Sequence, residues 1–269
     1  MLTTAFAPGS PNWLDLTSPD TAASVAFYTT VFGWTFASAG PEAAGYGLFQ
    51  HDGRTVAALA PHRAAADPAE GTTRPGWTIY FRTLDADRTT ELVEAAGGTV
   101  RLAPFSVFTD GRTAGCTDPA GAEFALWEPR ETPGLDAVTE PGTFCWAECY
   151  SVDAEAAKAF YRAVFSWQEQ DVPLGEVMYT VLTPAGGGTD DAHGGIMQLG
   201  PEQTAAGTTS HWLPYIEVPS VDAVVALAEQ LGATVRIPAM DVHGVGRLAQ
   251  LIDPHNAVFA VITSAAEGG

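Results

Sequence analysis

The chain has 269 residues, with 12 Lys and Arg against 32 Asp and Glu, so its formal net charge is −20. This charge disfavours nucleic acids, whose phosphates need cationic partners, and anionic membrane surfaces. Hydrophobic residues make up 46% of the chain, which is enough for a sizeable core. The sequence contains no apolar run of about 18 residues, so we expect no membrane span and no membrane partner.

The compartment is inferred from the N-terminus and the cysteines. The first residues lack a basic region followed by a long apolar stretch, so no signal peptide is predicted. Cys116, Cys145 and Cys149 are sparse and odd in number, which argues against a disulfide framework. We therefore expect a cytoplasmic protein whose thiols are buried in the core.

The predicted elements of the first half fall into two sets with the same order. A strand at 12–17 precedes a helix from Asp20 to about Phe32, and strands follow at 34–37, 46–50 and 55–59. The second set has a strand at 77–83, a helix at 85–96, and strands at 99–102, 112–117 and 123–127. Each set is a β-α-β-β-β module.

The second half repeats this order. Its third module has a strand at 144–150, a helix at 153–165, and strands at 178–182 and 195–199. Its fourth module has a strand at 212–218, a helix at 221–231, and strands at 234–237, 247–252 and 258–262. Two loops rich in Ala, Asp and Gly, 61–75 and 186–194, are expected to be tethers or cavity lids.

The halves are copies of one another. The aromatic boxes Phe27–Trp34 and Phe160–Trp167 lie 133 residues apart, and the pairs Asp118-Pro119 and Asp253-Pro254 lie 135 apart. Residues 129–142 are rich in Pro and Gly, which is typical of a linker. We expect a first domain at 1–132, a linker at 133–141 and a second domain at 142–269.

The repeated module, the Phe-Tyr-x-x-Val-Phe-Gly-Trp box and the Asp-Pro-x-Gly turn resemble the vicinal oxygen chelate superfamily, which includes glyoxalases, extradiol dioxygenases and bleomycin-binding proteins. The tandem form is similar to two-domain actinobacterial glyoxalase-like proteins. The resemblance implies an α+β fold, in which four βαβββ modules pair into two domains. Each domain would have a curled mixed sheet around a cavity. The fourth module departs from the turn motif, since Asn256 replaces its glycine.

The resemblance also says where a metal would bind. Members of this family place His, Gln or Glu on the first strand of a module and Glu on the last. The matching first-strand positions here are Trp13 and Trp146, and the last-strand positions are Ala125 and Ala260. None of these side chains ligates a metal. We therefore expect no metal and no cofactor at these positions.

Six histidines could supply ligands elsewhere, but no pair has metal-binding spacing. We expect them at the surface or in turns. His243 is an exception, because it aligns with Phe108 in a loop that often borders the cavity in this family. Both residues are therefore candidate ligand contacts.

Strand alternation and the repeat provide the other candidates. Asp15 and Glu148 are candidate acid–base residues, because a buried carboxylate can have a raised pKa. An alternative is that each carboxylate is paired with an arginine or exposed. The aromatic and charged candidates for ligand binding are Trp13, Tyr46, Tyr80, Arg82, Trp146, Tyr179, Tyr215 and Glu217. These aromatic rings would either line a cavity or fill it.

Four functions remain open at this point. The first is a metal-free protein that binds a small, partly aromatic organic molecule, for sequestration or antibiotic self-resistance. The second is a metal-independent isomerase, lyase or cyclase of natural-product metabolism that uses Asp15 or Glu148. The third is a glyoxalase- or dioxygenase-type metalloenzyme, and the fourth is a structural protein with filled sheets. The oligomeric state is not determined by the sequence.

Overall fold

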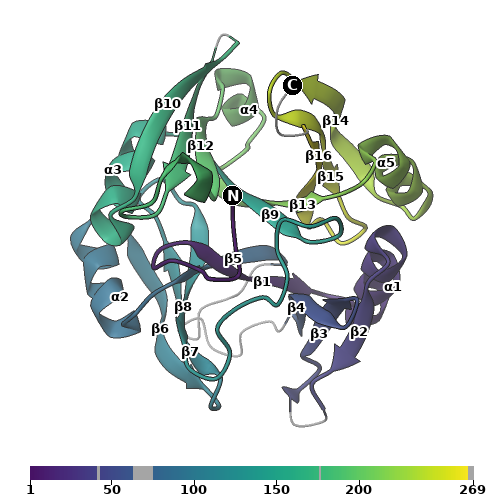
Figure 1. Ribbon diagram of the computed structural model, residues 1–269, viewed down its shortest axis with the longest axis horizontal. Helices are drawn as coiled ribbons and strands as arrows, with labels where there is room; N and C mark the ends of the chain where they lie inside the picture. The colour runs from purple at the N-terminus through teal and green to yellow at the C-terminus, as the bar shows by residue number, and fades with distance from the viewer. Residues whose placement is uncertain (41–42, 63–74, 176, 266–269) are drawn as a thin grey trace. The chain divides into compact units, whose positions relative to one another are not determined.

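The computed structural model describes all residues except 41–42, 63–74, 176 and 266–269. Among the described residues, the strands form two eight-stranded mixed sheets (Figure 1). The first sheet has the strand order β2-β3-β4-β1-β5-β8-β7-β6, and the second has β10-β11-β12-β9-β13-β16-β15-β14. Each sheet therefore holds two βαβββ modules, and the strand order is the same in both.

The first sheet carries the first two modules. The first consists of β1 (Pro11–Ser18), α1 (Thr21–Phe32), β2 (Thr35–Ser38), β3 (Gly47–His51) and β4 (Arg54–Pro61). The second consists of β5 (Gly76–Arg82), α2 (Ala86–Ala95), β6 (Thr99–Val107), β7 (Gly111–Thr117) and β8 (Glu123–Pro129). The predicted order of elements is confirmed for both modules.

The second sheet carries the other two. The third module consists of β9 (Phe144–Ser151), α3 (Ala154–Phe165), β10 (Gln168–Leu174), β11 (Val177–Thr183) and β12 (Gly194–Gln198). The short helix α4 (Pro201–Ala205) follows it. The fourth module consists of β13 (His211–Glu217), α5 (Val221–Gln230), β14 (Thr234–Val242), β15 (Gly246–Ile252) and β16 (Val258–Ser264).

The structure corrects three details of the prediction. Strand β10 and helix α4 were not expected. The sequence of β10 is polar and contains Pro173, and Pro is tolerated there because β10 is an edge strand. The edge strands β6 and β14 extend several residues beyond the predicted 99–102 and 234–237, and both contain β-bulges. Most of the predicted loop 61–75 lies outside the described residues.

Helix boundaries follow from capping residues. The Asp20 and Asp153 side chains accept hydrogen bonds from Ala23 N and Ala156 N, which satisfies backbone donors in the first turn. Helix α1 ends at Gly33, whose φ of 70° is the left-handed conformation that glycine adopts readily.

The three cysteines are free and buried, as expected. No helix among the described residues is long and apolar enough to cross a membrane.

The chain forms two compact units that each combine modules distant in sequence. The first unit comprises 1–13, 78–134 and 146–213, so it contains the second and third modules. The second unit comprises 14–77, 135–145 and 214–269, so it contains the first and fourth. Helices α2 and α3 contact each other in the first unit, as do α1 and α5 in the second (Figure 1). The domain boundaries expected from the sequence stay a prediction.

A buried hydrogen-bonded triad joins the two modules of the first unit. The Tyr161 hydroxyl in α3 donates to Asp118 Oδ2 over 3.1 Å, and Trp212 Nε1 donates to the Tyr161 oxygen over 2.7 Å. Asp118 Oδ1 accepts from the backbone N of Ala120 and of Ala122, which holds the Asp-Pro turn. Tyr161 is fully buried, so all of these polar groups need partners.

The second unit contains the same triad. The Tyr28 hydroxyl donates to Asp253 Oδ2 over 3.0 Å, and Trp77 Nε1 donates to the Tyr28 oxygen over 3.0 Å. The motif tyrosine of one module thus bonds the motif aspartate of another module in both units. The two motifs that identified the duplication are therefore also the contacts that pair the modules.

The tryptophans that end the two aromatic boxes bind the segments that precede the first strand of each half. Trp167 Nε1 donates to the carbonyl of Gly9, and Trp34 Nε1 donates to that of Gly142. Both glycines have a φ near 84°, and a Cβ at Gly9 would contact the Trp167 ring. The repeat therefore extends beyond the modules into these segments.

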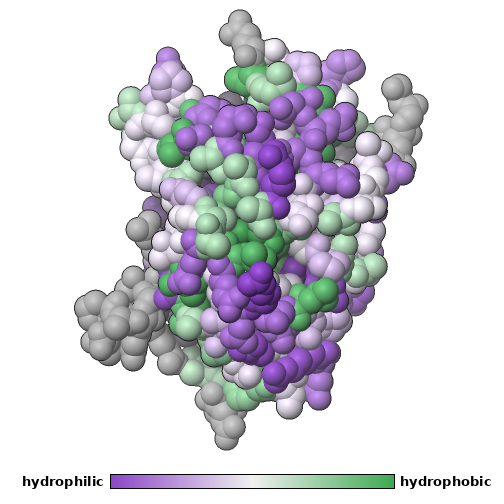
Figure 2. Space-filling view, turned by 90° about the vertical axis from the view of Figure 1, so that its left-hand side faces the viewer, coloured by the Kyte–Doolittle hydropathy of each residue, from purple (hydrophilic) through white to green (hydrophobic). Residues whose placement is uncertain are grey.

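The surface shown in Figure 2 is largely hydrophilic around a smaller apolar area, in keeping with the high charge.

Replacing the triad carboxylate should destabilise the fold. In Asp118→Asn the amide can still accept from the turn, but its NH₂ group faces the Tyr161 hydroxyl, which then has no acceptor. We expect a loss of about 1–3 kcal/mol in the free energy of unfolding, measured by urea denaturation. Asp253→Asn tests the same triad in the second unit. Unchanged stability in both variants would contradict the role of the triad.

The triad should also show a characteristic pH dependence. Burial raises the pKa of Asp118 above its ordinary value. The folded state therefore binds this proton more tightly than the unfolded chain, whose Asp pKa is about 3.9. The stability advantage of wild type over Asp118→Asn should be largest below that pH and should shrink as the pH rises through the folded-state pKa. An advantage that grows with pH over this range would contradict the assignment.

Candidate functional site

Strand β9 divides its side chains between two faces of the sheet. Cys149 is fully buried beside Tyr161 of α3, so Cys149 faces the helix. Trp146, Glu148 and Tyr150 alternate with it and lie on the opposite face. Only 5% of Glu148 is exposed, so a carboxylate lies in the interior of the protein on this face.

Tyr179 of β11 reaches across the neighbouring strand to this carboxylate. Gly195 of β12 lies between them, paired with Glu148 on one side and with Val181 on the other. A Cβ at Gly195 would collide with the Tyr179 hydroxyl. The absence of a side chain at 195 therefore lets the phenol ring lie over β12.

The Tyr179 hydroxyl has two partners on β9. Trp146 Nε1 donates a hydrogen bond to its oxygen over 2.8 Å. The pKa of Tyr179 is raised well above its ordinary value, first by burial and then by the negative charge of Glu148. The phenol is thus neutral and serves as a hydrogen-bonding group. Trp146, Glu148 and Tyr179 form what we call the second-repeat cluster.

The cluster continues along the same face. The rings of Tyr150 and His211 are stacked, with centroids 5.3 Å apart and an interplanar angle of 13°. A pocket of about 270 Å³ is lined by Gln168, Gln170, Val181 and Thr183, among other residues. Val181 and Thr183 follow Tyr179 at two-residue intervals on β11, so the pocket begins on the face that carries the second-repeat cluster.

The first repeat holds a shorter version of this arrangement. The Tyr46 hydroxyl donates to Asp15 Oδ1 over 3.1 Å, and Tyr46 and Asp15 precede Tyr179 and Glu148 by 133 residues each. Asp15 pairs with Ala58 where Glu148 pairs with Gly195. The shorter Asp15 thus faces alanine, whereas the longer Glu148 faces glycine. A tyrosine beside a carboxylate occurs in both repeats.

Three further candidates, Trp13, Tyr80 and Arg82, lie on the first strands of the first two modules. Trp13 stacks on Trp127 at 6.2 Å, and Trp127 Nε1 donates to the carbonyl of Thr132. Tyr80 and Arg82 are half-buried on β5, where Tyr80 pairs with Ala125 and Arg82 with Trp127. Their role in ligand binding stays a prediction.

The remaining candidates lie in different surroundings. Tyr215 is buried, and its carbonyl accepts a hydrogen bond from the Cys145 thiol. Glu217 accepts from the backbone N and the hydroxyl of Ser264. Phe108 and His243 are exposed in the turns between β6 and β7 and between β14 and β15. Ligand contacts by these four residues also stay predictions.

The side chains at the positions where the resemblance implies metal ligands do not fit a metal ion. The first-strand positions hold Trp13, which stacks on Trp127, and Trp146, which donates to Tyr179. The last-strand positions hold Ala125 and Ala260, opposite Tyr80 and Tyr215. Within the described part of the chain, no group of three or more His, Cys, Asp or Glu side chains could hold a metal ion.

Two residues were missed by sequence reasoning. Gly195 gave no signal, because its importance depends on which tyrosine lies over it. His193 lies in the loop between β11 and β12, as expected, but it is 1% exposed, so the expectation of a surface position is wrong. Loop residues just before a buried strand can be drawn into the core, and only the tertiary structure reveals this.

The chain is similar to known proteins along nearly its whole length. The family model described as the Glyoxalase/Bleomycin resistance protein/Dioxygenase superfamily matches residues 10–126. The chain is 39% identical to the anthracycline biosynthesis protein DauV of Streptomyces sp., over 96% of this chain and 94% of that protein. It is 34% identical to the putative glyoxylase CFP32 of Mycobacterium bovis, over 97% of each chain.

A solved structure shares the fold. The Mn(II)-bound glyoxalase from Novosphingobium aromaticivorans superposes with a TM-score of 0.63, covering 95% of this chain and 82% of that one. The sequences are 18% identical, so the likeness extends to the fold alone.

The contact between Gly195 and Tyr179 can be tested by a double-mutant cycle. Gly195→Ala should displace the phenol from Trp146 and lower the free energy of unfolding by about 1–3 kcal/mol. In a Tyr179→Ala background the same change should cost much less, because the colliding ring is gone. Urea denaturation gives the free energy of unfolding of wild type, the two single variants and the double variant. Additive costs would show that the two residues are not coupled.

Proposed function

Because the chain belongs to the glyoxalase/bleomycin resistance/dioxygenase superfamily, we propose that it binds a small, partly aromatic organic molecule without a metal ion. The binding face would be the one that carries the second-repeat cluster and the adjoining pocket. The observation that carries this proposal is the replacement of metal-ligand positions by a hydrogen-bonded tryptophan–tyrosine pair beside a buried carboxylate.

The chemistry of the cluster favours an aromatic ligand that carries hydroxyl groups. Trp146 is half-buried, and an aromatic partner gains roughly 0.5–1.5 kcal/mol from ring contact beyond the area that it buries. Glu148 is a hydrogen-bond acceptor for a hydroxyl group. The net charge of −20 opposes anionic ligands, so a neutral phenol suits the site better than a carboxylate.

The size of the pocket limits the ligand. At about 270 Å³ it lies below the roughly 300–1,000 Å³ of typical sites for drug-sized molecules. A one- or two-ring molecule, or part of a larger ring system, would fit. A relative named for anthracycline biosynthesis supports a ligand of the polycyclic aromatic class. Binding without conversion would serve sequestration or antibiotic self-resistance.

A second candidate is a metal-independent isomerase, lyase or cyclase reaction of natural-product metabolism. The buried Glu148 and Asp15 favour it, because each lies beside a tyrosine hydroxyl and could transfer a proton to or from a bound molecule. Glyoxalase- or dioxygenase-type metal chemistry finds less support, because its donor positions hold tryptophan and alanine.

Binding can be measured with 1-naphthol by isothermal titration, using protein dialysed against EDTA. We expect saturable binding, and Trp146→Leu should weaken it about tenfold through the lost ring contact. Trp13→Leu is the matched control in the first repeat and should leave the affinity unchanged. Absence of binding to naphthols and hydroxyanthraquinones alike would refute the proposal.

Recovery of the probe separates binding from catalysis. Under the binding proposal, chromatography should recover the ligand unchanged after incubation. Conversion that is lost in Glu148→Gln or Asp15→Asn would instead support the acid–base candidate.

Metal dependence is tested separately. Added manganese, nickel, zinc or iron should leave the melting temperature of the purified protein unchanged, since a ligand that binds only the folded state would raise it. Metal at one equivalent per domain, or a metal-dependent rise in melting temperature, would restore the metalloenzyme candidate.

A further inference from the structure

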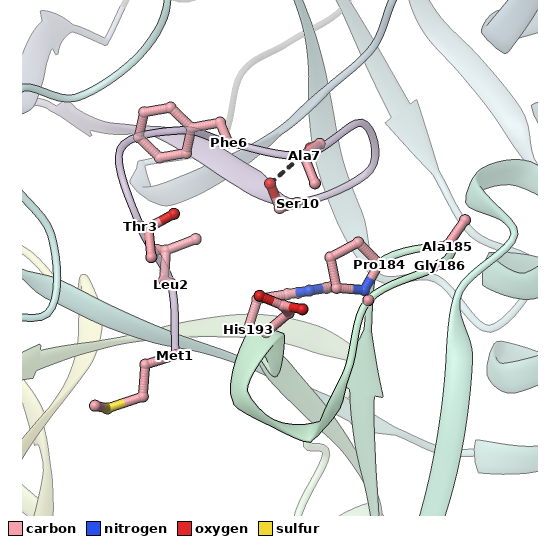
Figure 3. Close-up of a pocket in the computed structure, with 12 residues that line it drawn as sticks. Met1, Leu2, Thr3, Phe6, Ala7, Ser10, Pro184, Ala185, Gly186 and His193 are labelled. Carbon is pink, nitrogen blue, oxygen red and sulfur yellow. Dashed lines mark hydrogen bonds between the residues drawn. The ribbon is translucent and has the colours of Figure 1, made fainter.

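A second pocket lies in the first unit, between the N-terminal segment and the loop that joins β11 to β12. Its volume is about 220 Å³. Leu2, Phe6 and Pro184 contribute apolar walls, and His193 contributes a polar group (Figure 3). Asp191 is a second polar residue of the lining. An apolar cavity of about 150 Å³ is large enough to bind benzene. This pocket therefore has room for one substituted six-membered ring.

His193 is the unusual member of the lining. It is 1% exposed, and neither of its ring nitrogens has a hydrogen-bond partner. Burial lowers the pKa of His193 to about 3, so the imidazole is neutral near pH 7. A neutral imidazole has one N–H donor and one nitrogen acceptor. Buried polar groups without partners are rare in native proteins and call for an explanation.

The internal repeat shows that packing does not require a histidine here. Because Glu148 pairs with Gly195 and the equivalent Asp15 pairs with Ala58, His193 corresponds to Val56. Val56 is fully buried, so an apolar side chain fills this position in the first repeat. The histidine is therefore a feature of the second repeat, in a place where the fold accepts valine.

The loop beside His193 is also specific to the second repeat. In the first repeat, β3 and β4 are joined by the two-residue turn Asp52-Gly53. In the second, residues 184–193 join β11 to β12, and six of them line the pocket opposite the N-terminal segment: Pro184, Ala185, Gly186, Gly187, Asp191 and His193. The longer loop and the unpartnered imidazole therefore occur together.

We propose that this pocket is a second binding site, distinct from the face of the second-repeat cluster, for a neutral monocyclic phenol. The apolar walls hold the ring, and the phenol hydroxyl supplies the partner that the His193 imidazole lacks. Both ring nitrogens are covered, so binding includes a rotation of the imidazole toward the pocket. The charges beside the pocket are mixed, because Asp191 is acidic and the amino group of Met1 acts on His193 as a positive charge. The hydroxyl group of the ligand, rather than its net charge, is therefore the group that the pocket recognises.

Two fluorinated rings test this chemistry by ¹⁹F NMR at pH 7. We expect saturable binding of 4-fluorophenol and binding about fivefold weaker for fluorobenzene, which cannot form the hydrogen bond. The ring ¹⁵N resonances of His193 should shift during titration with 4-fluorophenol. They are assigned by their absence from the spectrum of His193→Val.

His193→Val provides the matched variant, because it installs the residue of the first repeat. Its melting temperature should equal or exceed that of wild type, since an unpartnered polar group is removed from the core. Its affinity for 4-fluorophenol should fall about fivefold, to the level of fluorobenzene. The His193 ring resonances report on this pocket alone, so their shift with 4-fluorophenol should persist in Trp146→Leu, which separates this site from the proposed aromatic-ligand site.

Three results would each overturn the proposal. They are equal affinities of wild type and His193→Val for 4-fluorophenol, equal affinities for 4-fluorophenol and fluorobenzene, and the absence of saturable binding. The last result, together with unshifted His193 resonances, would mean that the imidazole is satisfied by water or left unsatisfied.

Discussion

The buried hydrogen bond from a helix tyrosine to an Asp-Pro aspartate is the interaction on which the module arrangement depends. Tyr161 reaches Asp118, and Tyr28 reaches Asp253, across separations of 43 and 225 residues. Each aspartate also holds its own turn, and each tyrosine also accepts from a tryptophan. Because all these groups are buried, losing one leaves others without partners. The triads thus select which helix packs with which turn within each unit.

This arrangement fixes the faces of the sheets. Once α3 packs against one face, Cys149 must point toward it, and Trp146, Glu148 and Tyr150 must point away. A shift of one residue in the register of β9 would turn Trp146, Glu148 and Tyr150 toward the helix instead. The position of the carboxylate therefore follows from the same packing that holds Tyr161. The glycine at 195 then decides whether Tyr179 can reach that carboxylate.

The same framework accommodates different chemistry at equivalent positions. On the first strands, Trp146 donates a hydrogen bond from its indole nitrogen to Tyr179, and Trp13 stacks on Trp127. The two repeats also differ from each other: Asp15 and Ala58 in one correspond to Glu148 and Gly195 in the other, and Val56 corresponds to His193. A duplicated scaffold allows one copy to change while the other preserves the packing. The second repeat carries the longer loop, which lines both described pockets, and the N-terminal segment forms the other side of one of them.

The sequence by itself determined the modules, their order, the duplication and the family, because these depend on local periodicity, capping residues and motifs that recur along the chain. The resemblance was confirmed by relatives that match along nearly the whole length. The sequence also placed Asp15, Glu148 and Tyr179 on strands, whereas Tyr46 lies just before β3. Only the tertiary structure decided that the second module packs with the third and the first with the fourth, that Gly195 makes room for Tyr179, and that His193 is buried. These outcomes depend on contacts between residues far apart in the chain, which local patterns do not encode.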